Sequence, residues 1–436
     1  MLTGSEMAVV DANAAALGVP RKQLMESSGH ALARTVRNHA DPGDAVTVVA
    51  GRGNNGGDAL VAARFLDAFE LRVCLLGRPE TITTDIAREN WDALRSAAYP
   101  TEQVRDSSAT VLSVDVPSGL DAEDGTLADN AVVADHVVTF HDTKPGLAAI
   151  DASVTVADIG IPNAAERFVE RGDLQRLSRD PDSHKGDNGE VLVVGGGPYT
   201  GAPALSAQAA LRAGADLVRV AAPERVAREI QGYSENLIVR EYEGARLAPD
   251  HVDWLGSLAA DHDTLVLGPG LGDADATLAA VESLLAEFDG PAVVDADALS
   301  VVPDVETGAA LVCTPHQGEL RGMGGETGDD RRERADLVER FAADIGHTLL
   351  VKGPDDVVSD GDRTRVNRTG NAGMTVGGTG DVLAGVTGAL ACVLGPHDAA
   401  SVAAYATGRA GDIVVEERGS GLVATDLLAA IPQALS

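Results

Sequence analysis

The stretch Asn371–Gly385, NAGMTVGGTGDVLAG, combines several glycines with one carboxylate, Asp381, at the expected start of a helix. The residues directly before the carboxylate are Gly377, Gly378, Thr379 and Gly380. Successive glycine N–H groups at a helix N-terminus form an anion-binding site, and the helix dipole favours negative charge there. The Gly-Lys-Ser/Thr pattern of phosphate loops is absent, which is consistent with binding of phosphate by backbone amides alone.

Asp381 needs a different role from the glycines. A carboxylate beside an anion-binding site is disfavoured unless it receives a proton or orients a hydroxyl group. The pattern therefore predicts general acid or base catalysis on a hydroxyl that meets the phosphate.

A second glycine-rich stretch, GRGNNGGD at residues 51–58, follows an apolar run and precedes a helical run. Glycines at such a turn let the backbone approach a ligand, and the helix N-terminus offers free N–H groups. Asn54, Asn55 and Asp58 add polar side chains. The pattern favours a ligand site over a tight turn that uses Asn and Gly for positive φ.

Two further stretches place polar side chains at expected strand ends. In SVDVPSGLD (113–121), Asp115 faces the ligand crevice of a parallel sheet and is a candidate general acid or base, with an Asx turn as the alternative. In FHDTKPG (140–146), His141 and Lys144 are candidates to meet an anionic ligand, and solvated surface groups are the alternative.

The elements that must position these residues alternate along the chain, with short apolar runs between Ala-rich helical runs. This order predicts an α/β fold with parallel strands buried on both faces. The expected strands are residues 45–50, 72–76, 110–116, 136–140, 154–159, 190–195, 217–222, 264–268, 292–296, 310–314 and 348–353. In residues 329–346, helical spacing of apolar residues between an Asp and a Gly predicts a helix.

Five strand ends in the second half carry glycine or polar clusters. The clusters are residues 195–215, 268–272, 295–299, 314–319 and 352–356. Because strand C-terminal ends line one crevice in an open α/β sheet, we expect these clusters to meet.

The chain has 436 residues, more than one ordinary core holds, so two domains are expected. Residues 162–186 are charged and without a strand-like run, which places the boundary near Arg171, between residues 1–171 and 172–436. With no run of 18 apolar residues and no signal-peptide pattern, we expect a soluble, cytoplasmic protein.

The formal net charge is −33, from 34 basic and 67 acidic residues. Such a charge argues against nucleic-acid and anionic-membrane partners. Dispersed acidic residues with few lysines indicate a salt-rich cytoplasm, so we interpret the charge as the signature of a halophile. The three cysteines, which lack metal spacing and are expected to be reduced core residues, are Cys74, Cys313 and Cys392.

Residues 172–436 resemble the ribokinase-like family and, within it, the ADP/ATP-dependent NAD(P)H-hydrate dehydratases. The resemblance rests on HKGDNGEVLVVGG, GAPALSAQAALRAGADLV, GPGLG, DADAL, TPHQGE and GNAGMTVGGTGDVLAG, in that order. The first part resembles NAD(P)H-hydrate epimerase domains through GRGNNGGD, VDVPSGLDAEDG and VTFHDTKPGL. The resemblance implies a Rossmann-like three-layer N-terminal domain fused to a ribokinase-like three-layer α/β/α domain.

This resemblance implies repair of nicotinamide nucleotides. NADH and NADPH slowly add water to the nicotinamide ring, which gives R and S hydrates, NADHX and NADPHX. An epimerase interconverts the hydrates. A dehydratase phosphorylates the ring hydroxyl of the S form and eliminates phosphate, a better leaving group than hydroxide. The implied phosphoryl donor is ADP, with ATP as the alternative; Mg²⁺ is implied for the dehydratase, K⁺ for the epimerase, and a homo-oligomer is expected.

The resemblance also assigns site residues in the second part. Asp381 matches the base or orienting group at the hydrate hydroxyl. The positions that match hydrate contacts are Ala204, Gly272 and His316, and those that match nucleotide contacts are Lys352, Gly353, Pro354, Asp355, Asp356 and Gly380.

In the first part, Asp115 matches a carboxylate that contacts the substrate and catalyses the reaction. The matching substrate loop is Asn54, Asn55, Gly56, Gly57 and Asp58, and the matching potassium ligands are Asn55 and Ser118. One departure stands out. The family has a further strand and loop, of the type VDALLGTG, before the DVPSG strand, whereas here a helix at 85–97 leads through YPTEQVRDSSA almost directly into that strand.

The missing unit supplies a potassium-binding Asp and much of the substrate loop in the family. We therefore expect the first domain to be slow, inactive or completed by a partner subunit. Two alternatives stay open: a ribokinase-like small-molecule kinase for the second part, and a binding or assembly module for the first.

Overall fold

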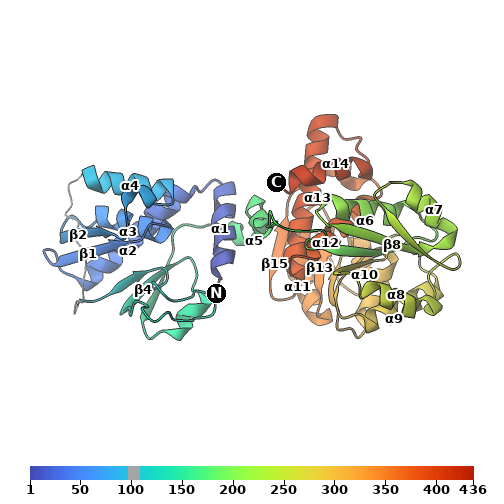
Figure 1. The fold of residues 1–436 in the computed structure, drawn as a ribbon, viewed down its shortest axis with the longest axis horizontal. Coiled ribbons are helices and arrows are strands. Elements are labelled where there is room, and N and C mark those ends of the chain that lie inside the picture. Colours follow the sequence, from blue (N-terminus) through green and yellow to red (C-terminus); the bar gives the residue numbers. More distant parts are fainter. Residues whose placement is uncertain (97–108) are drawn as a thin grey trace. The chain divides into compact units, whose positions relative to one another are not determined.

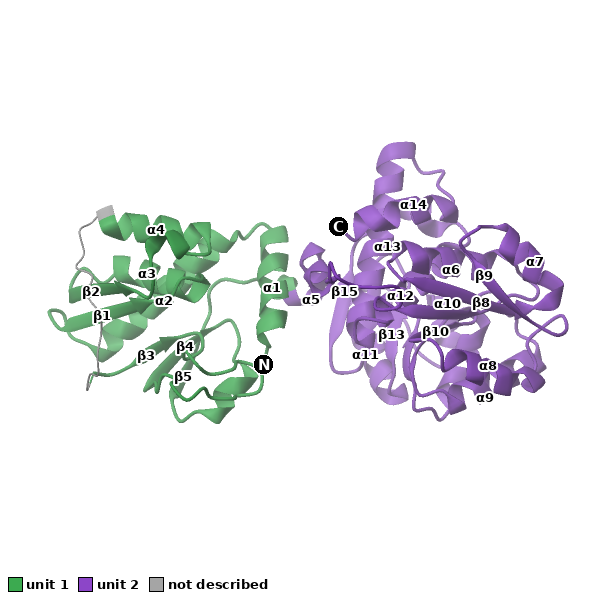
Figure 2. Cartoon of the chain, viewed as in Figure 1, with its two compact units in different colours: residues 1–165 green, residues 166–436 purple. Residues whose placement is uncertain are grey.

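The computed structural model describes residues 1–96 and 109–436, which form two compact units, Met1–Ala165 and Glu166–Ser436 (Figure 2). The short helix α5 (Ala164–Arg167) spans the division, and the boundary predicted near Arg171 falls in η3 (Arg171–Arg176) of the second unit. None of the helices formed by the described residues has the length and hydropathy that crossing a bilayer requires.

The first unit alternates helices with parallel strands (Figure 1). Its remaining helical elements are α1 (Gly4–Ala16), α2 (Arg21–His39), α3 (Asn54–Arg64), η1 (Pro79–Thr81), α4 (Asp85–Ser96) and η2 (Pro145–Ala149). Its strands are β1 (Ala45–Ala50), β2 (Glu70–Leu75), β3 (Leu112–Val114), β4 (His136–Phe140) and β5 (Ser153–Ala157). Helix α3, which carries the GRGNNGGD stretch into the core, packs so closely on α2 that a Cβ at Gly29 would lie 2.3 Å from Val61 Cγ1.

The strands of the first unit form two parallel sheets, β1–β2 and β3–β4–β5. Among the described residues, one edge of β1 and one edge of β3 have no strand partner. The strand–loop unit predicted to be missing would come just before β3, and residues 97–108 of that stretch lie outside the described residues.

The second unit is built on a sheet of ten strands in the order β6-β15-β14-β13-β12-β11-β10-β7-β8-β9. The strands are β6 (Phe168–Val169), β7 (Glu190–Val194), β8 (Leu217–Pro223), β9 (Ile238–Tyr242), β10 (Thr264–Leu267), β11 (Pro291–Val294), β12 (Ala310–Cys313), β13 (Thr348–Val351), β14 (Asp356–Ser359) and β15 (Thr364–Asn367). All neighbours are parallel except β14, which is antiparallel to β13 and β15.

Helices cover both faces of this sheet (Figure 1). One face packs against α6 (Gly201–Arg212), α7 (Glu224–Gly232), α12 (Thr379–Ala391), α13 (Pro396–Arg418) and α14 (Ala424–Ala434), and the other against α8 (Val252–Ala259), α9 (Asp275–Glu287), η5 (Ala296–Asp304), α10 (Gln317–Gly322) and α11 (Arg331–Ile345). Single turns form at η4 (Pro249–His251) and η6 (Ala372–Thr375). Along β7, Val191 and Val193 enter the first core while Leu192 and Val194 enter the second, as the strand period of two requires. The predicted three-layer α/β/α architecture is confirmed.

Every predicted strand is present, with ends within two residues of the expected positions. The prediction that residues 162–186 contain no strand is wrong, because β6 lies there and pairs with β15. The sequence patterns also miss β9, β14 and β15, and the expectation of parallel strands fails at β14. Two turns make β14 antiparallel to its neighbours: residues 352–355 reverse the chain between β13 and β14, and Asp360–Gly361, where Gly361 has φ of 93°, reverses it between β14 and β15.

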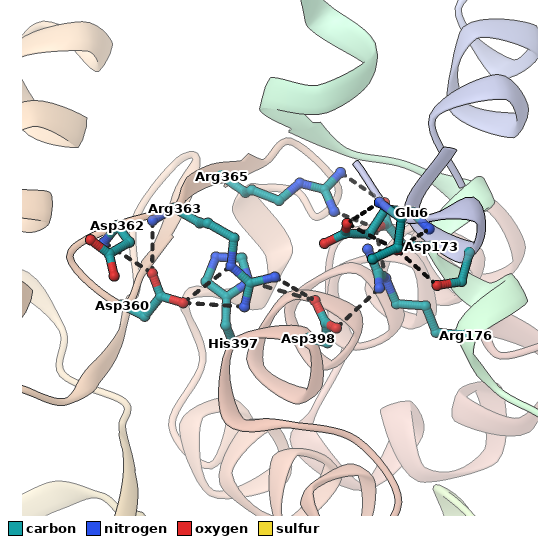
Figure 3. A network of polar contacts seen from close by, with 11 residues as sticks. Glu6, Asp173, Arg176, Asp360, Asp362, Arg363, Arg365, His397 and Asp398 are labelled. Carbon is teal, nitrogen blue, oxygen red and sulfur yellow. Dashed lines mark hydrogen bonds and ion pairs between the residues drawn. The ribbon is translucent and has the colours of Figure 1, made fainter. Parts of the chain in front are cut away.

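Ion pairs attach the segment after β6 to the second unit (Figure 3). Asp173 of η3 is fully buried and pairs with Arg365 of β15. Arg176 Nη1 lies 3.0 Å from Asp398 Oδ2 in the first turn of α13, and Asp398 Oδ1 lies 3.8 Å from Arg363 Nη1. The charged residues at the predicted boundary are therefore partly built into the second unit.

Helices α6 and α12 approach each other more closely than side chains allow, and Gly385 of α12 permits it. A Cβ at Gly385 would lie 2.0 Å from the carbonyl oxygen of Ser206. Gly385→Ala gains about 1 kcal/mol of helix propensity, but overpacking against backbone costs about 3 kcal/mol. We expect a net loss of stability, measured as a lower midpoint of urea unfolding.

Gly256→Ala is the matched control, because Gly256 lies in α8 with nothing within 4 Å of an added Cβ. Here only the helix propensity acts, and the midpoint should rise. If Gly385→Ala raised the midpoint as well, the close approach of α6 and α12 would be wrong.

Candidate active sites

The glycine-rich stretch enters α12 through Gly378, the N-cap residue, which has φ of 97°. A Cβ at Gly378 would lie 2.8 Å from Leu205 Cδ1, so both the conformation and the space favour glycine. Thr379 Oγ1 lies 3.0 Å from the carbonyl oxygen of Met374 and 3.2 Å from that of Val376, which fixes the loop. Because the first N–H groups of a helix have no intrahelical acceptor, this terminus offers amides to an anion.

Asp381 lies in the first turn of α12, two residues after the helix begins at Thr379. Its backbone carbonyl accepts a hydrogen bond from Ser206 Oγ of α6 at 2.8 Å, which ties the turn to the neighbouring helix. The pKa of the Asp381 carboxyl is raised to about 7, first by burial and then by the negative charge of Asp295, while Lys352 opposes the shift. Such a carboxyl exchanges protons near neutral pH, as a general base does.

Lys352 links three strand ends beside Asp381. Its Nζ donates to Asp295 Oδ1 at 3.0 Å and lies 3.7 Å from Glu319 Oε2. Thr314 Oγ1 donates to the same Asp295 oxygen at 2.7 Å. Burial lowers the pKa of Lys352, but the Asp295 and Glu319 carboxylates outweigh burial and raise it above its usual value. Lys352 therefore stays charged beside the amide-lined terminus, where a Cβ at Gly380 would lie 3.2 Å from its Nζ.

The rest of the predicted nucleotide segment forms the turn between β13 and β14. Gly353 N–H donates to Asp356 Oδ1 at 3.0 Å, and Asn367 Nδ2 donates to Asp356 Oδ2 at 3.0 Å. The pKa of Asp356 is raised to about 6, mainly by burial. Asp355 pairs with Arg331 Nε at 2.6 Å, while Pro354 is exposed at the tip. Asp356 thus organises the turn, whereas Gly353 and Pro354 leave its backbone open.

The three predicted hydrate contacts lie on three different elements. His316 is the N-cap residue of α10, its Nδ1 accepts the N–H groups of Gly318 and Glu319, and it forms a β-bridge with Lys352. Ala204 is buried in α6. Gly272, after β10, has φ of 77°, and a Cβ there would lie 2.9 Å from Pro198 Cγ.

The structure thus brings His316, Lys352, Gly380 and Asp381 together at one end of the sheet, and Ser206 connects α6 to them. Sequence reasoning did not name Asp295, Glu319, Thr314 or Ser206 as site residues. The signal was present, because Asp295 lies in DADAL and the TPHQGE stretch holds both Thr314 and Glu319, and each stretch was predicted to reach the crevice.

In the first unit, the half-buried Asp115 pairs with the buried Lys144. Asp115 Oδ1 lies 3.1 Å from Lys144 Nζ and accepts a hydrogen bond from Thr139 Oγ1 at 2.9 Å. Lys144 Nζ also donates to the carbonyl oxygens of Phe140 and Asp142, at 2.9 and 3.0 Å. Only 2% of Lys144 is exposed, so its interpretation as a solvated surface group is wrong.

Two more carboxylates lie near this pair. Asp58, in the second turn of α3, is buried, and its pKa is raised well above the usual value by burial and then by the charges of Asp115 and Asp11. The pKa of Asp11 on α1 is also raised, mainly by burial. The first unit therefore concentrates acidic groups that hold protons more tightly than surface carboxylates do.

The other residues of the predicted substrate loop open α3. Asn54 and Asn55 are exposed in its first turn, and Ser118 is exposed after β3. A Cβ at Gly56 would lie 2.1 Å from the carbonyl oxygen of Gly51, and one at Gly57 would lie 2.7 Å from Met25 Cε. These two glycines are thus required by packing within the protein, whatever their role toward a ligand.

Backbone strain marks the same strand ends. The non-glycine residues with positive φ in the described chain are Asp115 (63°) after β3, His141 (65°) after β4 and Ala296 (55°) after β11, next to Asp295. Such conformations cost about 1–3 kcal/mol each and cluster at functional sites. In both units, the strained backbone therefore lies at or next to the strand ends that hold the lysine–carboxylate pairs, Lys144–Asp115 and Lys352–Asp295.

An amide-lined helix start, a buried Lys–carboxylate cluster and a ten-stranded three-layer sheet place the second unit among the ribokinase-like enzymes. A family model described as NAD(P)H-hydrate dehydratase matches residues 191–433. A model described as YjeF-related protein N-terminus matches residues 21–107 and 101–146.

Relatives match over the whole chain. The bifunctional NAD(P)H-hydrate repair enzyme Nnr of Methanothermobacter thermautotrophicus is 41% identical over 491 aligned positions, which cover 99% of this chain and 94% of that protein. The enzyme of the same name from Archaeoglobus fulgidus is 38% identical over 472 positions, covering 100% and 98%. The chain belongs to the family of bifunctional NAD(P)H-hydrate repair enzymes.

Solved structures resemble the second unit in fold. The ADP/ATP-dependent NAD(P)H-hydrate dehydratase from Bacillus subtilis, co-crystallised with ATP and Mg²⁺, matches with a TM-score of 0.54 and 26% identity, covering 62% of this chain and 97% of that one. Protein SMU.573 from Streptococcus mutans shares the fold, with a TM-score of 0.55 and 20% identity over 62% and 98% of the two chains.

The alignments also bear on the length of the first unit. They extend over more positions than the 436 residues of this chain, so the relatives contain residues without a counterpart here. The match to the YjeF-related model is split into two pieces that overlap at residues 101–107. The overlap of the two pieces falls just before β3, where the strand–loop unit is predicted to be missing.

Proposed function

We propose that the second unit dehydrates S-NADHX and S-NADPHX by transferring a phosphoryl group from ADP, with ATP as the alternative donor, to the ring hydroxyl. The observation that carries this proposal is the Asp381 carboxyl, whose pKa is raised to about 7 in the first turn of an amide-lined helix. Asp381 accepts the hydroxyl proton as the hydroxyl oxygen bonds to the terminal phosphorus and the donor's bridging P–O bond breaks. Loss of phosphate and a proton from the ring then restores NAD(P)H.

The other residues position the donor. The N–H groups at the start of α12 bind the transferred phosphoryl group, and Lys352 neutralises charge on its oxygens. The backbone of residues 352–356 contacts the nucleotide. Ala204, Gly272 and His316 contact the hydrate.

Mg²⁺ would come with the nucleotide. No group of three or more metal-binding side chains exists in the part of the chain that the structure describes. Mg²⁺ usually takes one or two carboxylates together with substrate phosphates, so Glu319 beside Lys352 fits this need. Bound there, the metal would neutralise charge on the transferred phosphoryl group.

The test is an incubation of chemically hydrated NADH and NADPH with the full chain, Mg²⁺ and either nucleotide. We expect recovery of the reduced-nicotinamide absorbance together with release of inorganic phosphate. A ribokinase-like small-molecule kinase would instead consume the nucleotide without recovering absorbance. Absence of recovery with both ADP and ATP would refute the dehydratase.

For the first unit we propose interconversion of R and S hydrates, with Asp115 as the catalytic carboxylate and residues 54–58 as the substrate loop. The pairing of Asp115 with the buried Lys144 and the raised pKa of Asp58 support this proposal, and Asn55 and Ser118 offer oxygen ligands to K⁺. Full chain carrying Asp381→Asn should still equilibrate separated R and S hydrates, faster with K⁺ than with Na⁺. A rate no greater than the spontaneous one would favour the binding or assembly module.

We also propose that the protein works in a salt-rich cytoplasm. The support is the net charge of −33, since salt screens repulsion between exposed carboxylates. The thermal midpoint of unfolding should rise steadily between low and molar KCl. An unchanged midpoint would remove the basis for this interpretation.

A further inference from the structure

A cleft of about 640 Å³ lies at the edge of the second unit, beyond the residues assigned to the reaction. It is lined by Glu224, Arg225, Arg228, Glu241, Gly244 and Ala245. Arg225 and Arg228 lie three residues apart on α7, so they share one face of the helix. The other wall is the segment that follows β9.

The two arginines are exposed, and neither guanidinium forms a hydrogen bond or ion pair with any residue among those described. Glu224, by contrast, is tied to the far wall, because its Oε1 accepts the N–H of Gly244 at 3.2 Å. Of the two carboxylates that line the cleft, Glu224 is thus engaged by the far wall, which leaves Arg225 and Arg228 open to an anionic ligand. Guanidinium groups are well suited to phosphate, which they bind through paired hydrogen bonds.

The cleft adjoins the hydrate end of the proposed site. A Cβ at Gly197, after β7, would lie 3.7 Å from the carbonyl oxygen of Ala245 and 3.5 Å from that of Leu271. Ala245 lines the cleft, and Leu271 precedes Gly272, which matches a hydrate contact. The loop after β7 is therefore a wall common to both regions.

The strand order gives the separation of the two regions. From β10, which leads to Gly272, the sheet continues through β7 and β8 to β9. Adjacent strands lie about 5 Å apart, so the cleft is roughly 10–15 Å from β10. A dinucleotide whose nicotinamide ring lies at Asp381 extends over such a distance, and its remaining half carries phosphate groups.

We propose that Arg225 and Arg228 bind a phosphate of the adenosine half of the hydrated dinucleotide; this inference rests on the dehydratase function proposed above. The phosphate is either the pyrophosphate, which NADHX and NADPHX share, or the 2′-phosphate of NADPHX. These two residues then determine affinity for the hydrate and not the rate of the chemical step.

The test compares the full chain with an Arg225→Ala/Arg228→Ala variant, using both hydrates. We expect KM for the hydrate to rise about tenfold, as loss of charged hydrogen bonds does, while kcat and KM for the nucleotide stay within twofold. A rise for NADPHX alone identifies the 2′-phosphate, and a rise for both hydrates identifies the pyrophosphate. Glu241→Gln should lower KM, because it removes negative charge from the cleft.

Arg212→Ala at the C-terminal end of α6 is the matched control and should change nothing, since Arg212 lies outside the cleft lining. Direct titration with NADPH supplies a readout that needs no turnover: the double variant should bind more weakly than wild type. An unchanged KM for both hydrates and unchanged NADPH binding would overturn the proposal. Lack of dehydration by the wild-type chain would instead count against the proposed function, and the titration would still decide the role of the cleft.

Discussion

Asp381→Asn should lower kcat for hydrate dehydration about 10³-fold, within the range for loss of a general base, while nucleotide binding stays close to that of wild type. The amide keeps the size and the neighbours of the carboxyl but cannot accept the hydroxyl proton. The N–H groups at the start of α12 and the 352–356 turn, which bind the nucleotide, are unchanged. Single-turnover kinetics and nucleotide titration measure the two quantities separately.

The pH profile of the wild-type chain provides the second readout of this prediction. The base works only when ionised, so kcat should rise about tenfold per pH unit below the pKa of Asp381 and level off above about 7. The rate rises with pH, and does not fall, because burial and the charge of Asp295 hold the proton on Asp381 up to near neutral pH. This rise of kcat with pH, the acidic limb of the profile, should be absent from the residual activity of Asp381→Asn.

Asp297→Asn is the control for this profile. Asp297 lies two residues from Asp295, and although much of the residue is exposed, partial burial and then the charge of Asp273 raise its pKa as well. Asp297 is not among the charges that shift the pKa of Asp381, so kcat and the limb should stay as in wild type. A full limb in Asp381→Asn, or turnover near the wild-type rate, would show that another group takes the proton.

The architecture of the second unit could be predicted from sequence because its central strands are continuous apolar runs. Strands buried on both faces need apolar residues at nearly every position, so they can be recognised from composition alone. The strands of this kind are β7, β10, β11, β12 and β13. β14 and β15 carry Asp356, Arg365 and other polar residues, so their sequences lack that signal. Their position depends instead on the turn at Gly361 and on the buried pair of Arg365 with Asp173, which is distant in sequence.

The candidate site was predictable only in part, for a related reason. Asp381 stands out because it follows glycines at a helix start, which is a local pattern. Asp295 and Glu319 become site residues only through Lys352, which lies 57 residues after Asp295 along the chain and 3.0 Å from it in space. Local patterns place each strand end at the crevice but do not state which side chains meet there.

In the first unit, a local sequence pattern left the environment of one residue undecided. The FHDTKPG stretch left Lys144 open to a surface role, since a lysine after a strand is usually solvated. Lys144 can be buried because its ammonium group finds partners that no local sequence pattern indicates. These are Thr139, two backbone carbonyls and Asp115, which is held at positive φ. These contacts depend on the pairing of β3 with β4, which aligns Asp115 with Thr139.

Lys352→Met should lower kcat/KM for the nucleotide by about 10²–10³, since it removes the cation beside the transferred phosphoryl group. It should also move the acidic limb of the pH profile to higher pH. Lys352 is the positive charge that opposes the raised pKa of Asp381, and without it only burial and the charges of Asp295 and Glu319 remain. The displacement of the limb is the decisive readout, because loss of phosphate binding alone would leave the limb in place.

The same substitution should destabilise the fold, since Asp295 is buried and would lose its ion-pair partner. Removal of one member of a buried pair costs about 3 kcal/mol or more, and the Asp295 side chain is only 4% exposed. Lys352→Met/Asp295→Asn should recover most of that stability, because Asn keeps an oxygen for the Thr314 hydroxyl, yet it should not recover nucleotide turnover. If the double variant regained activity along with stability, Lys352 would act only by holding Asp295, and the direct role toward the phosphoryl group would be wrong.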